Sequence, residues 1–305
     1  MIQNPKPITI INVPLDLGAS RRGTDAGPSA MRIAGLINAI TSIGYQEVSE
    51  IDIPVPIPES GIATGNARFK NEILGICTEL GNQTRKALSS GEVPLVIGGD
   101  HSIAMGSVSG VSAYLKKNNQ KLGLIWFDAH GDMNLPETSP TGNVHGMPLA
   151  HLLGYGDTEL ASIMDINPTV AAENVVLIGL RDIDRQERDF INQSGVTAFT
   201  MRDIDQLGMC EISSRALEIV NKGTAGFHMS FDVDGCDPEV IPGSGTLVPG
   251  GVNLREAHLL LEECASNGGL LSMDIVELDP FLDNKNISAE RAVTFVQSLL
   301  GRNIL

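Results

Sequence analysis

Two short acidic segments constrain the fold of this chain more than any other feature. The segment 128–132, with the sequence DAHGD, follows the apolar run 122–127, and the segment 230–235, SFDVDG, continues the apolar run 226–231. Closely spaced carboxylates at the end of a buried strand carry a large desolvation and repulsion cost unless cations lie between them. We therefore expect the chain to fold around cations bound at the ends of these two strands.

Six side chains are available to hold such cations. Side chains alternate along a strand, so the odd–even spacing within each acidic segment can aim its ligands at one side. A histidine that follows a third apolar run, 94–97, adds another imidazole. The pattern predicts a two-metal site made from His101, Asp128, His130, Asp132, Asp232 and Asp234.

The rest of the chain predicts an α/β fold. Apolar runs alternate with amphipathic stretches from end to end, and several of these runs are continuously hydrophobic, which indicates strands buried on both faces of a sheet. We expect one three-layer domain spanning residues 1–305, with a mostly parallel central sheet of about eight strands flanked by helices. The clearest helices are expected at 254–264 and at 289–300, the second with Ser288 as its N-cap. The expected strands are 8–13, 45–53, 95–97, 122–127, 175–180, 196–200, 226–231 and 269–276.

The expected metal ligands all follow strands, which agrees with this fold. Ligands of open α/β sheets gather at the carboxyl ends of the strands. For the six side chains to converge, strands that are far apart in the sequence must be close neighbours in the sheet. We therefore expect Asp128 and Asp232 to lie within about 10 Å of each other.

Composition excludes several classes of function. The net charge of −16 argues against a nucleic-acid partner, because phosphate binding needs clustered Lys and Arg. An acidic surface can attract a cationic substrate, but the more ordinary interpretation is a surface that keeps a cytosolic protein in solution. No apolar run approaches the ~18 residues of a membrane span, so we expect no membrane partner and a cytoplasmic location. The four cysteines are expected to be reduced, and Cys236 is a weaker alternative ligand because its carboxylate neighbours suit hard cations.

Three motifs carry a resemblance to a known family. The segments 98–102 (GGDHS), 128–132 (DAHGD) and 230–238 (SFDVDGCDP) resemble, in this order, those of the ureohydrolases, the family of arginases, agmatinases and their relatives. Further matches extend the resemblance over the whole chain; they are 13–18, 21–23, 27–32, 245–246, 250–251 and 274–277.

Within this family the chain looks most like an arginase. The distinguishing stretches are 132–134, 141–146 and 181–187, which in arginases hold the amino-acid end of the substrate. Agmatine lacks the carboxylate that these loops bind. The resemblance implies that Asn134, Thr141 and Asn143 lie near the α-carboxylate. It also implies that Asp184 and Glu187 lie near the α-ammonium group.

The resemblance also implies how the metal ligands are divided. One metal would take His101, Asp128, Asp132 and Asp232, and the other would take His130, Asp128, Asp232 and Asp234, so that Asp128 and Asp232 bridge. An oxygen-rich ligand set suits Mn²⁺ better than Zn²⁺, so we expect two Mn²⁺ ions per subunit, although Co²⁺ or Ni²⁺ could substitute in vitro.

The activity implied is the hydrolysis of L-arginine to L-ornithine and urea by a hydroxide that bridges the two metals. Glu277 would pair with the guanidinium group, Thr246 would support Glu277, and His145 would shuttle the proton to the departing amine. The resemblance also implies a catalytic role for Asp132, in addition to its role as a metal ligand. The resemblance further implies a homotrimer or a homohexamer.

Two alternatives remain open at this stage. One is another ureohydrolase, acting on agmatine, guanidinobutyrate or formiminoglutamate. The other is a non-catalytic protein that binds basic amino acids on the same fold, although the presence of both His145 and Glu277 argues against it.

Overall fold

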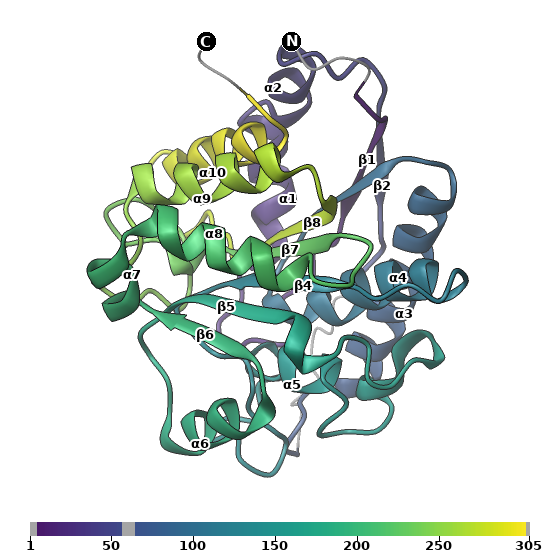
Figure 1. The fold of residues 1–305 in the computed structure, drawn as a ribbon, viewed down its shortest axis with the longest axis vertical. Coiled ribbons are helices and arrows are strands. Elements are labelled where there is room, and N and C mark those ends of the chain that lie inside the picture. Colours follow the sequence, from purple (N-terminus) through teal and green to yellow (C-terminus); the bar gives the residue numbers. More distant parts are fainter. Residues whose placement is uncertain (1–4, 57–64, 303–305) are drawn as a thin grey trace.

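The apolar runs of the sequence form one parallel sheet in the computed structural model, which describes residues 5–56 and 65–302 (Figure 1). Every strand pair in this sheet is parallel, whereas the sequence predicted a mostly parallel sheet. The strand order is β2-β1-β3-β8-β7-β4-β5-β6. The strands are β1 (Ile8–Asn12), β2 (Val48–Asp52), β3 (Val93–Ile97), β4 (Gly123–Phe127), β5 (Val175–Leu180), β6 (Thr197–Thr200), β7 (Phe227–Asp232) and β8 (Leu270–Val276).

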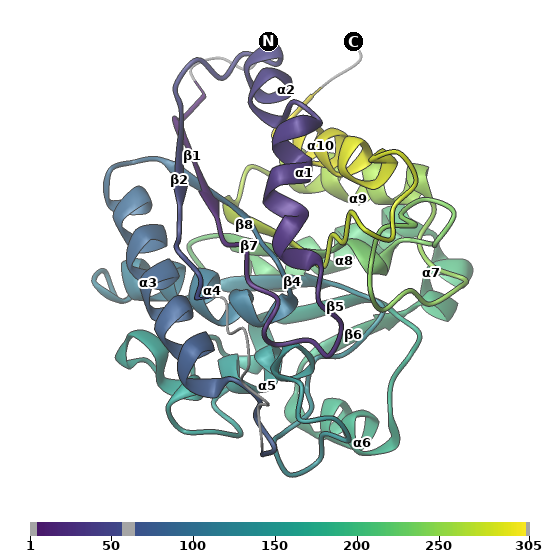
Figure 2. The ribbon, with the colours of Figure 1, turned by 180° about the vertical axis from the view of Figure 1, so that it is seen from behind.

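Helices cover both faces of the sheet and make it the middle of three layers (Figures 1 and 2). Helices α3, α4 and α5 pack on one face, and α1, α2, α8, α9 and α10 cover the other. The helices are α1 (Gly27–Ile33), α2 (Leu36–Ser42), α3 (Lys70–Ser89), α4 (Ala104–Lys116), α5 (Pro148–Leu152), α6 (Arg185–Ser194), α7 (Met201–Leu207), α8 (Met209–Val220), α9 (Leu254–Asn267) and α10 (Ile287–Leu299). In the part of the chain that the structure describes, no helix is long and apolar enough to cross a membrane.

The continuous hydrophobicity of the central strands is explained by their burial on both faces. Every residue of β4 and β7 is buried. Along β4 the side chains alternate between two cores: Ile125 and Phe127 pack with α8 and α9, while Leu124 and Trp126 pack with α4 and α5. The central strands therefore form a rigid base from which the loops of the site extend.

The N-cap predicted for the last helix was wrong, and the helix begins at Ile287 where the sequence predicted residue 289. Helix α10 has Asn286 as its N-cap, and Ser288 lies within the helix. The Ser288 hydroxyl donates to Asp283 (2.8 Å) and accepts from the backbone N–H of Gly243 (2.9 Å). The serine thus joins two loops to the helix, which its position in the sequence did not reveal.

The sheet order brings together the strands that the expected ligands follow. Strands β3, β8, β7 and β4 are consecutive neighbours, although β3 and β8 are far apart in the sequence. All four point in one direction, so the loops that leave their carboxyl ends meet at the same edge of the sheet.

Candidate metal centre

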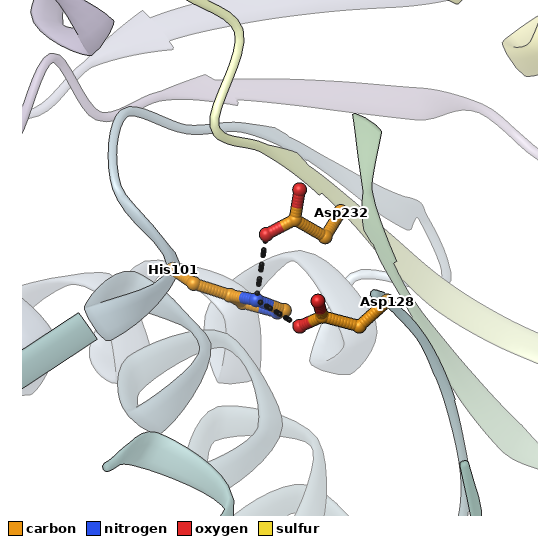
Figure 3. A group of neighbouring side chains, drawn as sticks. All are labelled: His101, Asp128 and Asp232. Atoms are coloured by element: carbon orange, nitrogen blue, oxygen red, sulfur yellow. Dashed lines mark ion pairs between the residues drawn. The ribbon is translucent and has the colours of Figure 1, made fainter. Parts of the chain in front are cut away.

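The expected metal ligands converge above the four central strands. His101 begins a short 3-10 helix (His101–Ile103) after β3, Asp128 follows β4, and Asp232 ends β7. Figure 3 shows the His101 ring pointing between the carboxylates of Asp128 and Asp232. Because His101 Nδ1 lies 3.2 Å from Asp128 and 3.1 Å from Asp232, the predicted proximity of the two acidic segments is confirmed.

The first ligand group surrounds His101 Nδ1. Three carboxylate oxygens, from Asp128, Asp132 and Asp232, lie 3.0–3.2 Å from this nitrogen. Among the described residues neither His101 Nδ1 nor Asp132 Oδ2 has a hydrogen-bond partner, although both atoms are buried. Ligands at right angles around an octahedral ion, about 2.1 Å from it, are about 3 Å apart. The spacing and the unpartnered atoms therefore fit a divalent cation.

The second ligand group surrounds His130 Nδ1. This nitrogen lies 3.3 Å from Asp128 Oδ1 and 3.2 Å from Asp234 Oδ2. Asp128 turns its other oxygen, Oδ2, toward His101, so its two oxygens serve the two groups separately. Asp232 belongs to the first group only, and its expected bridging role stays a prediction.

The buried carboxylates at this site repel one another, and the repulsion changes their pKa values. Burial and the neighbouring charge of Asp128 raise the pKa of Asp132 to about 7. Burial also raises the pKa of Asp232, with Asp234 and Asp128 adding to the effect. Although burial alone would raise the pKa of Asp128, the two imidazoles beside it lower this pKa below its usual range. Such a cluster holds its carboxylates in the ionised form only with positive charge among them.

Aromatic packing and close backbone contacts hold the ligand loops in place. The Trp126 ring stacks on His101, with ring centroids 4.1 Å apart, and its Nε1 donates to Asp128 Oδ2 (3.1 Å). A side chain at Gly99 would place a Cβ only 1.6 Å from the carbonyl oxygen of Leu15, so this position requires glycine. Asp100 accepts from the backbone N–H of Gly18 and Ser102, so it holds the loop that carries His101.

Glu277 and His145 form a buried pair beside the first ligand group. Glu277 Oε1 accepts from His145 Nδ1 (2.9 Å) and from the backbone N–H of His101 (2.9 Å). Burial opposes both charges, but the attraction between the two groups raises the pKa of His145 to about 9 and lowers that of Glu277. Glu277 also has a left-handed backbone, with φ of 62°, which costs a residue of this type about 1–3 kcal/mol and is typical of functional sites.

A cavity of about 220 Å³ opens above both ligand groups. Most of the expected substrate-binding residues line it, whereas Thr141 and Asn143 do not. Asp182, which the sequence analysis did not select, does line it, with its carboxylate 3.9 Å from His130 Nε2. The cavity is lined by His101, His130, Asp132, Asn134, His145, Gly146, Asp182, Asp184, Glu187, Asp232, Asp234 and Thr246.

Known proteins resemble this chain in sequence and in fold. A family model described as "Arginase family" matches residues 6–301. The chain belongs to the arginase family. The arginase of Brevibacillus brevis is 44% identical over 300 residues, which cover 98% of this chain and 99% of the relative. The crystal structure of Bacillus caldovelox arginase matches with a TM-score of 0.94 at 42% identity, covering 98% of this chain and 100% of that one. Entamoeba histolytica arginase in complex with L-ornithine matches with a TM-score of 0.92 at 34% identity, covering 98% and 100%.

In this member of the arginase family, one wall of the cavity is built at the start of α6. Asp184 is the N-cap of α6 and accepts from the backbone N–H of Glu187 (2.9 Å). Asn134 Nδ2 donates to the other oxygen of Asp184 (2.9 Å). Glu187 accepts from the backbone N–H of Met133 (2.9 Å), and burial raises the pKa of Glu187 to about 8. The expected residues for the α-ammonium group therefore lie together and are joined to the ligand loop.

The two expected residues outside the cavity wall belong to the loop that carries His145. Asn143 Oδ1 accepts from Ser20 Oγ (2.9 Å) and from Arg68 Nη1 (3.1 Å). Thr141 Oγ1 accepts from the backbone N–H of Asn143 (3.2 Å). In the structure these side chains thus hold the loop in place.

Two residues of this family member contact the second ligand group in ways that the sequence did not reveal. Thr246 donates to Asp234 Oδ2 (2.7 Å), and among the described residues it makes no hydrogen bond to Glu277, so its expected support of Glu277 stays a prediction. The Arg181 guanidinium donates to the backbone carbonyls of Asp234 (2.7 Å) and Cys236 (3.1 Å). Cys236 itself belongs to neither ligand group.

Proposed function

We propose that this chain hydrolyses the guanidinium group of L-arginine to give L-ornithine and urea, with two Mn²⁺ ions bound per subunit. The observation that carries the proposal is the pair of ligand groups that share Asp128 beneath the cavity. His101, Asp128, Asp132 and Asp232 would hold one ion, and His130, Asp128, Asp232 and Asp234 the other. One imidazole and several carboxylate oxygens per ion suit Mn²⁺.

When bound, the two ions would lower the pKa of a shared water and balance the negative charge that develops during attack on the guanidinium carbon. The chain supplies the anionic ligands that keep the ions in place. Trp126 and Thr246 orient two of these ligands, Asp128 and Asp234, through single hydrogen bonds.

Glu277 would orient the guanidinium group for attack. Its pKa is lowered by His145, despite burial, so the carboxylate is ionised at neutral pH and can accept two N–H bonds from a guanidinium group. His145 lies 2.9 Å from Glu277 and, with a pKa of about 9, carries a proton at neutral pH. His145 also lines the cavity, so it can deliver this proton to the departing amine.

The wall at the start of α6 would bind the amino-acid end of the substrate. Asp184 offers an ionised carboxylate, because its hydrogen bonds to the backbone of Glu187 and to Asn134 lower its pKa despite partial burial. A cationic α-ammonium group is attracted to this wall, and the acidic chain as a whole attracts a cationic substrate. Thr141 and Asn143 would act from the neighbouring loop, near the α-carboxylate.

A comparison of substrates tests the proposal. Purified protein is loaded with Mn²⁺, its metal content is measured, and urea release is compared for L-arginine, agmatine and guanidinobutyrate, with the corresponding hydrolysis of formiminoglutamate. We expect two ions per subunit and the fastest turnover with L-arginine. Robust activity on agmatine without activity on L-arginine would assign the chain to another ureohydrolase, and binding of L-arginine without turnover would indicate a binding protein.

We also propose a cytoplasmic homotrimer or homohexamer, on the strength of the family resemblance alone. Light scattering of the purified protein distinguishes the two assemblies, and a monomer would overturn both.

A further inference from the structure

A row of polar side chains lies inside the central sheet, away from the cavity. His228 and Ser230 are two residues apart on β7, and Ser272 and Asp274 are two residues apart on β8, so that each pair shares a face of its strand. The register places Ser230 beside Asp274 and His228 beside Ser272. All four side chains are fully buried. Burying such groups costs several kcal/mol unless each is hydrogen-bonded, so the partner of each of the four side chains has to be identified.

The row is a continuous hydrogen-bonded chain that ends at a metal ligand. Ser272 Oγ lies 2.6 Å from His228 Nδ1, and His228 Nε2 lies 2.9 Å from Asp274 Oδ2. The other oxygen of Asp274 accepts from Ser230 Oγ at 2.6 Å. Ser230 Oγ in turn lies 2.9 Å from His101 Nε2, the ring nitrogen that faces away from the ligand carboxylates.

The charge of the Asp274 carboxylate decides which group donates in each hydrogen bond between it and His101. Both oxygens of Asp274 face donors: Oδ2 accepts from Ser107 of α4 and lies 2.9 Å from His228 Nε2, and Oδ1 accepts from Ser230. A carboxyl group surrounded by donors in this way is an ionised acceptor. An ionised carboxylate can only accept hydrogen bonds, so the single proton of Ser230 is donated to Asp274. Ser230 is then left with lone pairs toward His101 and can only accept from Nε2–H. The proton of a neutral His101 ring therefore lies on Nε2, which leaves Nδ1 free.

We propose that Asp274 is a positioning residue of the metal centre. Acting through Ser230, it fixes the tautomer and the orientation of His101, so that Nδ1 presents its lone pair to a divalent cation, while His228 holds Asp274 from the other side. The inference rests on the proposed function, since it requires that the first ligand group binds a metal. Loss of such an outer hydrogen-bond partner typically weakens metal binding by about 10- to 100-fold.

The test is a double-mutant cycle on metal affinity. Metal-free wild type, Asp274→Ala, Ser230→Ala and the double variant are titrated with Mn²⁺, and free Mn²⁺ is measured by electron paramagnetic resonance. We expect Asp274→Ala to bind one of its two ions roughly 10- to 100-fold more weakly, because the Ser230 hydroxyl becomes free to donate to Nε2. In the Ser230→Ala background the same substitution should have little further effect, since Asp274 acts through Ser230.

A matched control separates positioning from general loss of core packing. His151 is also fully buried, but within residues 5–56 and 65–302 its ring bonds only the backbone carbonyl of Met147 and the backbone N–H of Asp157. His151→Gln should lower thermal stability and leave both Mn²⁺ affinities unchanged. If Asp274→Ala does not fold, as judged by circular dichroism, the cycle is run with His228→Gln, for which we expect a smaller weakening that also disappears without Ser230.

The outcomes distinguish the inference from the proposed function. Wild type that binds no Mn²⁺ would overturn both. Wild type that binds two ions, combined with normal affinity in Asp274→Ala or with an effect that persists undiminished in the Ser230→Ala background, would overturn the positioning role alone.

Discussion

The two ligand groups of the metal centre differ in how they are enclosed. The His101 side chain is 1% exposed, stacked on Trp126 and joined to a buried polar row. The His130 side chain is 25% exposed and faces Asp182 across the cavity. We call them the enclosed half (His101, with Glu277 and His145 beside it) and the open half (His130, with Asp182 and Asp184 beside it). In the proposed function, the enclosed half would fix the reacting groups, and the open half would admit and select the substrate.

The largest effect should come from the residue that joins the two halves. Asp128→Ala removes one oxygen from each ligand group, so we expect loss of both ions and of nearly all urea production, well beyond the roughly 100-fold cost of losing one outer partner. Metal analysis and a urea assay measure both. Asp237→Ala is the matched control, because in the described part of the chain this carboxylate accepts hydrogen bonds only from backbone N–H groups. If Asp128→Ala made urea at the normal rate, the two-ion arrangement would be wrong.

A substitution in the enclosed half should slow the chemistry without releasing metal. His145→Asn removes the proton donor beside Glu277, and loss of a general acid typically lowers kcat by about 100- to 10,000-fold. Both ions should remain, because His145 belongs to neither ligand group. Steady-state kinetics together with metal content separate the two effects. Unchanged kcat would remove His145 from the proton transfer.

A substitution in the open half should weaken substrate binding instead. Asp184→Asn removes the charge that would face the α-ammonium group, and a hydrogen bond to a charged group contributes about 1.5–3 kcal/mol, so KM for L-arginine should rise roughly 10- to 100-fold with little change in kcat. Asparagine is also a good N-cap, so α6 should stay intact. Asp203→Asn, at the start of α7, controls for a general effect on helix ends. A fall in kcat at unchanged KM would contradict the assignment of substrate binding to the open half.

The last prediction concerns the stability of the metal-free protein and leaves turnover aside. Since the pKa of Glu187 is raised from 4.5 to about 8, the folded state binds more protons at this group than the unfolded state within this window. Its contribution to stability therefore falls as pH rises, by about 3 kcal/mol between pH 4.5 and pH 7. Glu187→Gln keeps an oxygen for the Met133 N–H and should show a shallower decline in chemical denaturation. Parallel profiles for the two proteins would contradict the assignment.

Much of the fold was predictable because buried strands appear in the sequence as uninterrupted runs of apolar residues. All eight expected strands are present. The central ones were the clearest, since strands buried on both faces are continuously apolar, whereas β2 and β6 at the edges of the sheet are only partly buried. The convergence of His101, Asp128 and Asp232 also followed, because each ends or follows a parallel strand and such strands end at one edge of the sheet.

The partners of individual polar side chains were not predictable. Thr246 was expected beside Glu277 but binds Asp234, and Ser230 meets Asp274 only because of the register between β7 and β8. Loop conformation and strand register depend on packing across the whole sheet, which local patterns do not record. The motif around 181–187 indicated the cavity wall, but it gave no reason to select Asp182 from its acidic neighbours.

Trp126 is the single tryptophan of the chain, and its ring lies against His101 while its N–H reaches Asp128. The molecule thus carries an intrinsic fluorophore in contact with the first ligand group, at the aspartate that the two groups share, and with no competing indole elsewhere. Its emission should be quenched as paramagnetic ions enter, so loading of the centre can be followed optically, in real time and without a label.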